Sequence, residues 1–455
     1  MSLNFFQYIF YNQVLCILER DDLVMYKRSR FNVVSETDSG ELIIYNSYSG
    51  AIALFDQAEA EKVQKLLISG EDCNGNLEQQ LVQQGFLVKS DVDEKRRATF
   101  LHQTMHRTDS MHLVILPTEA CNFRCTYCYE DFPRGKMTEK AKQGLKNYVK
   151  QQGKYLKQLT VSWFGGEPLL ADDIINELSA TFLQVATEHD IEYSAEIATN
   201  GFLLTKERFR QLLKNGIRQV MVTIDGEEAE HNQRRKLANG EGSFATIMNN
   251  LQSLKEVEGD FEVTVRTNFD EESLASMPEF ISAIKAKFGD DPRFKTYFRP
   301  IARWGGKNDE CLPVCDRSTI DEKIWEFTEK AIDAGLPMSS LIAGSLQPTA
   351  SVCYAAKPNS FIVASDAQIF KCTLAFDAEE NQLGTLEEDG TLNIDYDKLA
   401  LWTTSGEETD ENCQSCFFRP ACQGNHCPYY RKATGDRPCS HEKRQIKKVL
   451  RLIAK

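Results

Sequence analysis

This sequence has no long apolar run. No stretch of its 455 residues approaches the roughly 20 consecutive apolar residues of a membrane-spanning helix. Its apolar opening, MSLNFFQYIFYNQVLCIL, lacks the basic flank and the small-residue cleavage site of a secretory signal, so we predict a packed N-terminal strand or helix there. We therefore expect a cytoplasmic protein with no membrane partner.

The sequence also lacks an excess of positive charge. Its 53 Lys and Arg residues are outnumbered by 67 Asp and Glu residues, which gives a net charge of −14. A surface that binds the phosphates of nucleic acids is usually basic, so we expect no nucleic-acid partner. No internal repeat or low-complexity tract is visible, which argues against a repeat protein.

The first cysteine group lacks a fourth member. The stretch EACNFRCTYC places Cys121, Cys125 and Cys128 in C-x3-C-x2-C spacing after an apolar run. Without a secretory signal, the 14 cysteines of the chain favour metal ligation over disulfides. A structural zinc site needs four ligands, so three thiolates predict a metal centre with one open position.

Residues 30 to about 90 form a predicted α+β unit. FNVVSE, ELIIYN and GAIALF are expected to be short strands, followed by the helices QAEAEKVQKLLISG and NLEQQLVQQG and a further strand, FLV. The charged SDVDEKRR that comes next is predicted to be a linker. The final HEKRQIKKVLRLIAK is predicted to be a basic amphipathic helix that packs on the body of the protein.

From about residue 111 the pattern changes to strands that alternate with helices. Such repetition predicts a parallel sheet or partial barrel, in which active sites lie at the carboxyl ends of the strands. Polar or glycine residues follow five of the predicted strands, which indicates an active site at that edge. The six predicted strands cover residues 111–116, 159–164, 191–198, 219–224, 261–266 and 294–301.

The cysteine spacing, Tyr127 before the last cysteine, and Gly-Gly-Glu-Pro at residues 165–168 resemble the marks of the radical S-adenosylmethionine (SAM) superfamily. The resemblance implies that the three cysteines hold a [4Fe–4S] cluster whose open iron binds SAM. It also implies an α/β partial (β/α)6 barrel over residues 105–310, followed by a bridging region over residues 311–340.

The same resemblance implies the residues that contact SAM. Gly165, Gly166 and Glu167 are expected near its methionine amino group, where glycines permit close backbone contact. For each of the strand-end residues, the alternative is an ordinary polar side chain with no ligand. The other expected cofactor-binding residues are Tyr127, Thr199, Asn200, Asp225, Arg234, Arg266 and Asn268.

A second cysteine-rich segment spans residues 341–455. Its CQSCFFRPACQGNHC resembles the SPASM extension of peptide-modifying radical enzymes, although x4 replaces x3 before the last cysteine and Ala367 replaces a glycine. The resemblance implies two auxiliary [4Fe–4S] clusters, for three clusters in all; two zinc sites are the alternative. The implied ligands are Cys353, Cys372 and Cys427 for the first auxiliary cluster, and Cys413, Cys416, Cys422 and Cys439 for the second.

The fourth ligand of the first auxiliary cluster is not evident from the sequence. Cys311 and Cys315 have C-x3-C spacing and either supply it or remain free thiols. If they remain free, one iron is open and a thiol of the substrate is its natural occupant, because coordination deprotonates a thiol and holds it near a reaction partner.

The whole arrangement resembles thioether-forming maturases of ranthipeptides, of the PapB type. That resemblance implies a winged-helix-like domain over residues 1–95 that binds the leader of a precursor peptide, an electron donor of flavodoxin or ferredoxin type, and crosslinking of a cysteine sulfur to carbon. Carbon–carbon crosslinking, formylglycine formation and epimerisation are alternatives within the superfamily. A non-catalytic iron–sulfur electron carrier or peptide-binding scaffold is the alternative of a different class. The sequence does not identify a catalytic base.

Overall fold

The computed structural model describes residues 25–69, 75–131, 134–404, 406–407 and 410–455. The strand or helix predicted for the apolar opening lies outside these residues. Within them, no helix is long and apolar enough to cross a membrane.

The N-terminal unit contains a three-stranded antiparallel sheet in the order β2-β3-β4, which confirms the three predicted strands. A two-stranded sheet of β1 and β5 accompanies it. The predicted helices and the FLV strand are also present. The bounds are β1 Tyr26–Arg28, β2 Asn32–Glu36, β3 Leu42–Asn46, β4 Ile52–Phe55, α1 Gln57–Ser69, α2 Asn76–Gln83 and β5 Leu87–Lys89.

Strand β3 is buried on both faces, which fixes this unit to the rest of the protein. Leu42 and Ile44 pack into the unit's own core, against α1 and α2, whereas Ile43 and Tyr45 belong to the main core. The C-terminal helix α17 (Ile446–Ala454) contacts β2 and β3. It therefore packs on the body of the protein, as predicted.

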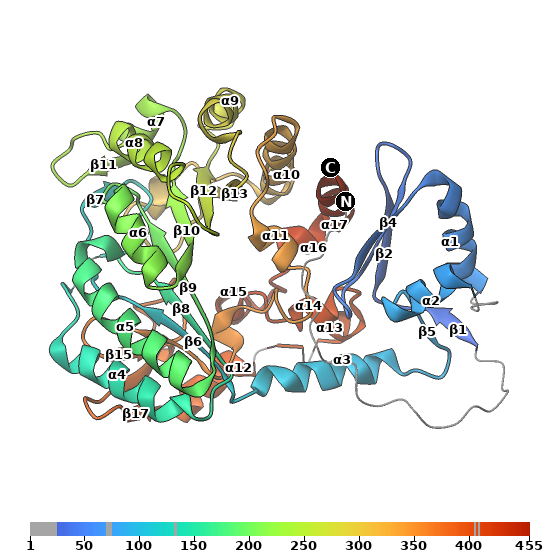
Figure 1. Ribbon diagram of the computed structural model, residues 1–455, viewed down its shortest axis with the longest axis horizontal. Helices are drawn as coiled ribbons and strands as arrows, with labels where there is room; N and C mark the ends of the chain where they lie inside the picture. Colours follow the sequence, from blue (N-terminus) through green and yellow to red (C-terminus); the bar gives the residue numbers. More distant parts are fainter. Residues whose placement is uncertain (1–24, 70–74, 132–133, 405, 408–409) are drawn as a thin grey trace.

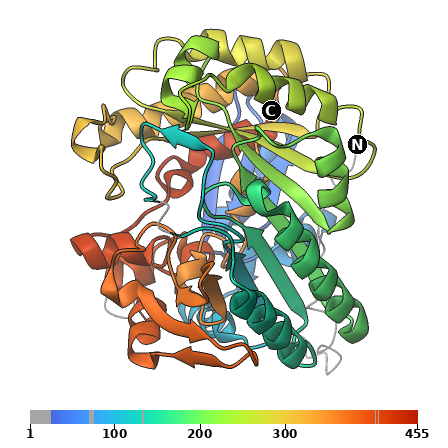
Figure 2. The ribbon, with the colours of Figure 1, turned by 90° about the vertical axis from the view of Figure 1, so that its left-hand side faces the viewer.

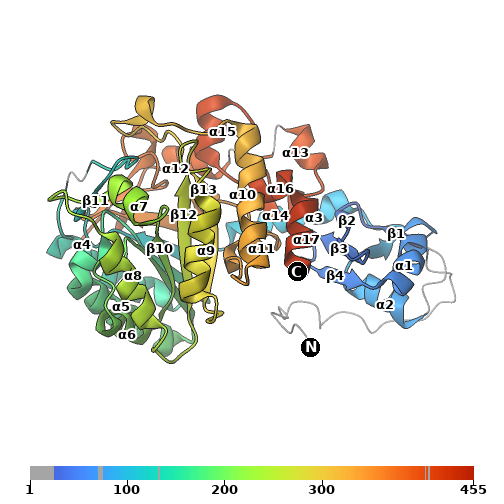
Figure 3. The ribbon, with the colours of Figure 1, turned by 90° about the horizontal axis from the view of Figure 1, so that it is seen from above.

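The predicted linker is wrong in its second half. Helix α3 (Glu94–Gln103) begins inside it, because the side chain of Asp93 accepts a hydrogen bond from Arg96 N and caps the helix. The short helix η1 (Thr104–His106) follows. Helix α3 runs from the N-terminal unit to the large sheet, with the C-terminal helices beside it (Figure 1; Figure 3). Residue 95, the predicted domain boundary, thus lies within a helix.

The six predicted parallel strands are confirmed and follow the order β13-β12-β10-β9-β8-β6. Helices α4, α5, α6 and α8 lie along one face of this sheet (Figure 1). The strands are β6 Ser110–Ile115, β8 Gln158–Trp163, β9 Glu192–Thr199, β10 Ile217–Thr223, β12 Glu262–Phe269 and β13 Phe294–Pro300. The helices are α4 Glu139–Gly153, η2 Pro168–Ala171, α5 Asp172–His189, α6 Lys206–Lys214, α7 Glu228–Arg234, α8 Phe244–Leu254 and α9 Met277–Phe288.

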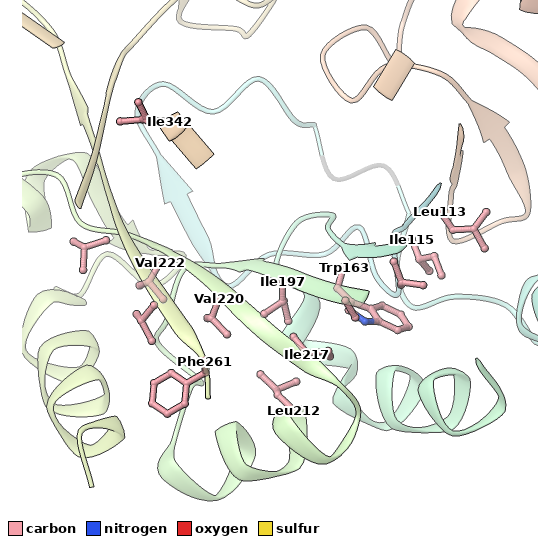
Figure 4. Packing of buried hydrophobic residues seen from close by; sticks show 14 of the residues in the cluster. Leu113, Ile115, Trp163, Ile197, Leu212, Ile217, Val220, Val222, Phe261 and Ile342 are labelled. Atoms are coloured by element: carbon pink, nitrogen blue, oxygen red, sulfur yellow. The ribbon is translucent and has the colours of Figure 1, made fainter. Parts of the chain in front are cut away.

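The core lies between these strands and helices. Leu113, Ile115 and Trp163 are buried at one end of the cluster, and Val220 and Phe261 are buried further along the sheet (Figure 4). Burying such side chains supplies most of the stabilisation of a sheet covered by helices. The ends of the strands that lie outside this apolar core can carry polar residues.

The sheet continues into the C-terminal segment, which the sequence pattern did not predict. Strand β14 pairs in parallel with β6, and β15, β16 and β17 follow as antiparallel neighbours, giving ten strands in all (Figure 2). Ala367, in the position of the family's glycine, has φ of +71° in the turn between β14 and β15. A glycine takes this left-handed conformation more readily than an alanine does. The added strands are β14 Ser360–Val363, β15 Gln368–Phe370, β16 Gln382–Leu386 and β17 Leu392–Ile394.

Helices, most of them short, make up most of the remaining C-terminal part, and α10, α11, α14 and α16 lie between the large sheet and the N-terminal unit (Figure 3). They comprise η3 Asp309–Cys311, α10 Arg317–Asp333, α11 Ser340–Gly344, η4 Tyr354–Ala356, η5 Glu379–Asn381, α12 Tyr396–Thr403, α13 Glu411–Ser415, α14 Arg419–Cys422, α15 Pro428–Thr434 and α16 His441–Arg444.

Candidate functional site

The first cysteine group lies on the loop that follows β6. Part of this loop is the short strand β7 (Phe123–Cys125), which pairs with β11 (Arg235–Leu237) so that Cys125 is opposite Arg235 (Figure 1). Cys121, Cys125 and Cys128 are half-buried free thiols. The pairing holds the cysteine loop over the carboxyl ends of the strands.

Gly165 and Gly166 pack against the backbone of the same loop. A Cβ atom on Gly165, where φ is +114°, would lie 2.3 Å from the carbonyl oxygen of Thr118. A Cβ atom on Gly166 would lie 2.5 Å from the carbonyl oxygen of Ala120. Because a larger residue would displace the cysteine loop, both glycines are required for the position of the thiols.

Glu167 is fully buried and joins the ends of two strands. Its carboxylate accepts hydrogen bonds from Thr199 Oγ1 at 2.7 Å and from Asn200 N at 2.7 Å, at the end of β9. It also accepts one from Leu169 N at 3.0 Å. Burial raises the pKa of this carboxyl, while the three donors lower it. These hydrogen bonds connect the segment after β8 to the end of β9, so Glu167 fixes the position of this edge of the sheet.

Tyr127 connects the cysteine loop to two further strands. Its hydroxyl donates to Asp225 after β10 and accepts from Asn268 Nδ2 at 3.0 Å, on β12. Asp225 in turn accepts from Asn268 N at 2.8 Å. Arg235 Nη1 donates to the Tyr127 hydroxyl at 2.6 Å. The structure thus brings together Tyr127, Asp225 and Asn268, three residues that were predicted separately.

The two predicted arginines differ in their partners. Arg234 Nη2 donates to the buried carboxylate of Asp270 at 2.6 Å, and its buried Nη1 has no hydrogen-bond partner among the described residues. Arg266 Nε donates to Asn268 Oδ1 at 2.9 Å. A buried N–H group without a partner is costly, so Arg234 Nη1 is suited to a polar ligand group.

The residues around the first cysteine group fit an iron–sulfur cluster with SAM. Burial raises the pKa of Cys121 and of Cys128 to about 12, so without a metal these thiols stay neutral. Metal coordination deprotonates a buried thiol and compensates its charge. The cysteine donors on this loop are three thiols, and Arg234 Nη1 is a buried donor without a partner among the described residues.

The four cysteines predicted for the second auxiliary cluster line one cavity of about 420 Å³. Its other lining residues include several cations and one exposed acid, Asp436. We call these four thiols the second auxiliary group; they are Cys413, Cys416, Cys422 and Cys439.

Cys353, Cys372 and Cys427 also come together, and we call them the first auxiliary group. Burial raises the pKa of Cys372 to about 12, and the charges of Cys353 and Cys427 add to the shift. Cys311 and Cys315 do not join them. Burial raises the pKa of Cys315 to about 11, helped by the carboxylates of Glu271, Asp270 and Asp316, and Cys311 is exposed on η3.

No three His, Cys, Asp or Glu side chains in the described part of the chain converge on a single metal ion. A zinc site requires its ligands within about 2.3 Å of one ion. A [4Fe–4S] cluster binds each thiolate through a different iron and tolerates wider spacing.

Three contributing residues were not predicted from the sequence. Arg235 is next to the predicted Arg234, and nothing in the sequence separates their roles. Asn122 accepts a hydrogen bond from Asn200 Nδ2 at 2.8 Å. Glu119 accepts from Arg134 Nε at 2.8 Å and from Ser365 Oγ at 2.7 Å, which ties the cysteine loop to the C-terminal hairpin. The contact between Asn122 and Asn200 and the contact between Glu119 and Ser365 join segments that are far apart in the sequence. A local sequence pattern therefore does not predict them.

Comparison with known proteins agrees with this geometry. Residues 115–283 match the family model of the radical SAM superfamily. The chain is 24% identical over 340 residues to the serine-type anaerobic sulfatase-maturating enzyme of Klebsiella aerogenes, covering 71% of this chain and 81% of that enzyme. It is 24% identical over 311 residues to the mycofactocin maturase MftC of Mycolicibacterium smegmatis, covering 68% of this chain and 75% of that protein.

The fold is also similar to a solved structure, "Native anSMEcpe with bound AdoMet and Cp18Cys peptide", with a TM-score of 0.55 and 18% identity. The similarity covers 76% of this chain and 98% of the other. The chain therefore contains a radical SAM domain, and the enzymes that it is similar to include protein- and peptide-modifying maturases.

Proposed function

We propose that this enzyme modifies a ribosomally made precursor peptide by joining a cysteine sulfur to a carbon of the same peptide as a thioether. The observation that carries the proposal is the first auxiliary group, in which the structure brings together three thiols and leaves Cys311 and Cys315 elsewhere. Residues 1–95 act as a winged-helix-like leader-binding domain, residues 311–340 as a bridge, and residues 341–455 as a SPASM domain.

Three [4Fe–4S] clusters and SAM complete the proposed enzyme. Cys121, Cys125 and Cys128 hold the radical cluster, and the two auxiliary groups hold the others. When bound, the radical cluster and SAM supply a 5′-deoxyadenosyl radical that abstracts hydrogen. The chain positions SAM through Gly165, Gly166, Glu167, Arg234 and the network around Tyr127. An external electron donor, of flavodoxin or ferredoxin type, supplies the electrons.

A cavity of about 260 Å³ lies against the large sheet and includes residues next to the first auxiliary group in sequence. Its lining includes Tyr354 and Thr373, the residues directly after Cys353 and Cys372. His112 of β6 packs edge-on against Tyr354, with ring centroids 5.7 Å apart, and its Nε2 is 2.8 Å from Ser162 Oγ. We propose that this cavity receives a side chain of the substrate peptide, because two of its lining residues directly follow cysteines of the first auxiliary group.

In the proposed reaction, the acceptor carbon of the peptide loses a hydrogen atom, which becomes part of 5′-deoxyadenosine. The thiol loses its proton, the C–S bond forms, and one electron leaves to an electron carrier. The peptide therefore loses two hydrogens and keeps its sulfur. The protein's part is to hold the thiol and the carbon together and to exclude water.

Formylglycine formation is the second candidate, and the sulfatase-maturating relatives favour it. Acting on a cysteine, it would remove the sulfur from the peptide, whereas thioether formation would retain the sulfur without a free thiol. The test is therefore the fate of the peptide sulfur after anaerobic turnover with SAM and a reductant. Carbon–carbon crosslinking and epimerisation would leave the thiol free.

The leader of the precursor is proposed to add to the free edge of β4. Strand β4 has β3 as its partner in the described sheet, and an extended peptide can pair with such an edge. Leu54 on β4 is 45% exposed, although it is large and apolar. Removing the whole N-terminal unit is a poor test, because Val33, Ile43 and Tyr45 belong to the main core.

We predict that Leu54→Lys weakens binding of the precursor peptide by about 1–2 kcal/mol, because burial of one large apolar side chain is lost. Cleavage of SAM should not change. Fluorescence anisotropy of a labelled precursor measures the affinity. Ile68→Lys is the matched control, since Ile68 is 85% exposed on α1 and is not part of the three-stranded sheet. Equal affinities for Leu54→Lys and wild type would show that the leader does not use this edge.

A further inference from the structure

The second auxiliary group differs from the other two cysteine groups in its hydrogen-bond donors. Arg431 Nη2 donates to Cys413 Sγ at 3.3 Å, and Lys443 Nζ donates to Cys439 Sγ at 3.3 Å. At the other two groups, within the described part of the chain, the donors to sulfur are backbone N–H groups. These are Phe123 N to Cys121, Leu374 N to Cys372 and Tyr430 N to Cys427, each at 3.4 Å.

Further hydrogen bonds hold the Arg431 side chain in place. Arg431 Nη1 donates to Asp410 at 3.2 Å, and its Nη2 also donates to the carbonyl of Gly424 at 3.1 Å. Lys443 is half-buried, and it interacts with the charges of Cys416 and Cys422 as well as with Cys439. One ammonium group therefore faces three of the four thiols.

Further cations surround this group. Arg317, Arg437 and Arg419 also line its cavity, although Arg419 is paired with the buried Glu407 and Arg437 with Asp410. The first auxiliary group has Lys371 nearby, but its Nζ donates to the carbonyls of Lys357 and Ser360 instead of a sulfur. Direct N–H⁺ to sulfur contacts thus distinguish the second auxiliary group, in which Cys413 Sγ also lies 3.4 Å from Asp410 Oδ2.

We propose that Arg431 and Lys443 raise the reduction potential of the cluster held by the second auxiliary group. The inference rests on the proposed function, which assigns a cluster to this group. Reduction adds negative charge to the iron and sulfur atoms, and cationic hydrogen-bond donors stabilise that charge. A cluster whose sulfur ligands accept hydrogen bonds only from backbone N–H groups is stabilised less in its reduced form.

The test is a redox titration of the full chain, reconstituted anaerobically and followed by electron paramagnetic resonance. In Lys443→Gln and in Arg431→Gln, we expect the midpoint of one cluster to fall by at least 59 mV, which is a tenfold change in its one-electron equilibrium constant. The other two midpoints should not move. Lys443→Arg, which retains a cationic donor, should stay close to wild type.

Lys432→Gln is the matched control, because it removes one positive charge from α15, the helix that carries Arg431. Its Nζ lies 4.6 Å from the ring centroid of Trp402 and 3.5 Å from Glu380, and it makes no recorded contact with sulfur. An equal shift in Lys432→Gln, or unchanged midpoints in variants with full iron content, would overturn the tuning proposal alone. A wild-type protein with no cluster at these four cysteines would instead refute the proposed cofactor set.

Discussion

The variant with Cys121, Cys125 and Cys128 all replaced by Ala should form no 5′-deoxyadenosine above background when incubated with SAM and dithionite. The three thiols are the proposed ligands of the radical cluster, and thiolates are the usual ligands of such clusters. Chromatography of the nucleoside product measures the effect. The auxiliary groups are separate from this loop. The variant should therefore lose the iron of the radical cluster and retain the iron of the two auxiliary clusters.

Cys311→Ala is the matched control. Cys311 is an exposed thiol on η3 in the segment that contacts the cysteine loop, where Asn308 Nδ2 donates to the carbonyl of Thr126 at 3.0 Å. We expect this variant to cleave SAM as wild type does. Product formation by the triple variant, or its loss in Cys311→Ala alone, would contradict the assignment of the radical cluster.

Glu167→Ala should lower the free energy of unfolding by about 2–5 kcal/mol and weaken SAM binding. The substitution leaves the N–H groups of Leu169 and Asn200 without their acceptor, and each unsatisfied buried group costs about 1–3 kcal/mol. The ends of β8 and β9 would also lose their connection. Urea denaturation measures the stability, and equilibrium dialysis with labelled SAM measures the binding.

Two further variants make this test specific. Glu167→Gln keeps one acceptor oxygen, so its loss of stability should be smaller than that of the alanine variant. Glu192→Ala removes an exposed carboxylate at the other end of β9, and we expect a change within about 0.5 kcal/mol. Wild-type stability and SAM affinity in Glu167→Ala would show that this carboxylate does not organise the site.

The large sheet could be predicted because its strands are short apolar runs that alternate with helices, and residues such as Leu113 and Val220 are buried in the core as expected. Strand β14 was missed because residues 360–363 follow a loop-rich segment and pair with β6, almost 250 residues earlier. Helix α3 was missed because its first turn is highly charged and was interpreted as a linker, although Asp93 caps the helix.

The candidate site was only partly predictable. Spacing identified the cysteines, and the strand ends identified Thr199, Asp225 and Asn268. The sequence did not indicate that Glu167 binds Thr199 and Asn200, or that Tyr127 joins Asp225 to Asn268. These contacts depend on the register of neighbouring strands, which local sequence does not specify.

The central claim is tested most directly by the fate of sulfur in a cysteine-containing precursor peptide. The reconstituted enzyme is incubated anaerobically with SAM, a reductant and the peptide, and the product is treated with iodoacetamide before mass spectrometry. We predict a peptide that has lost two hydrogens, retains its sulfur and is not alkylated. A product that has lost its sulfur, or one whose thiol is still alkylated, would contradict thioether formation.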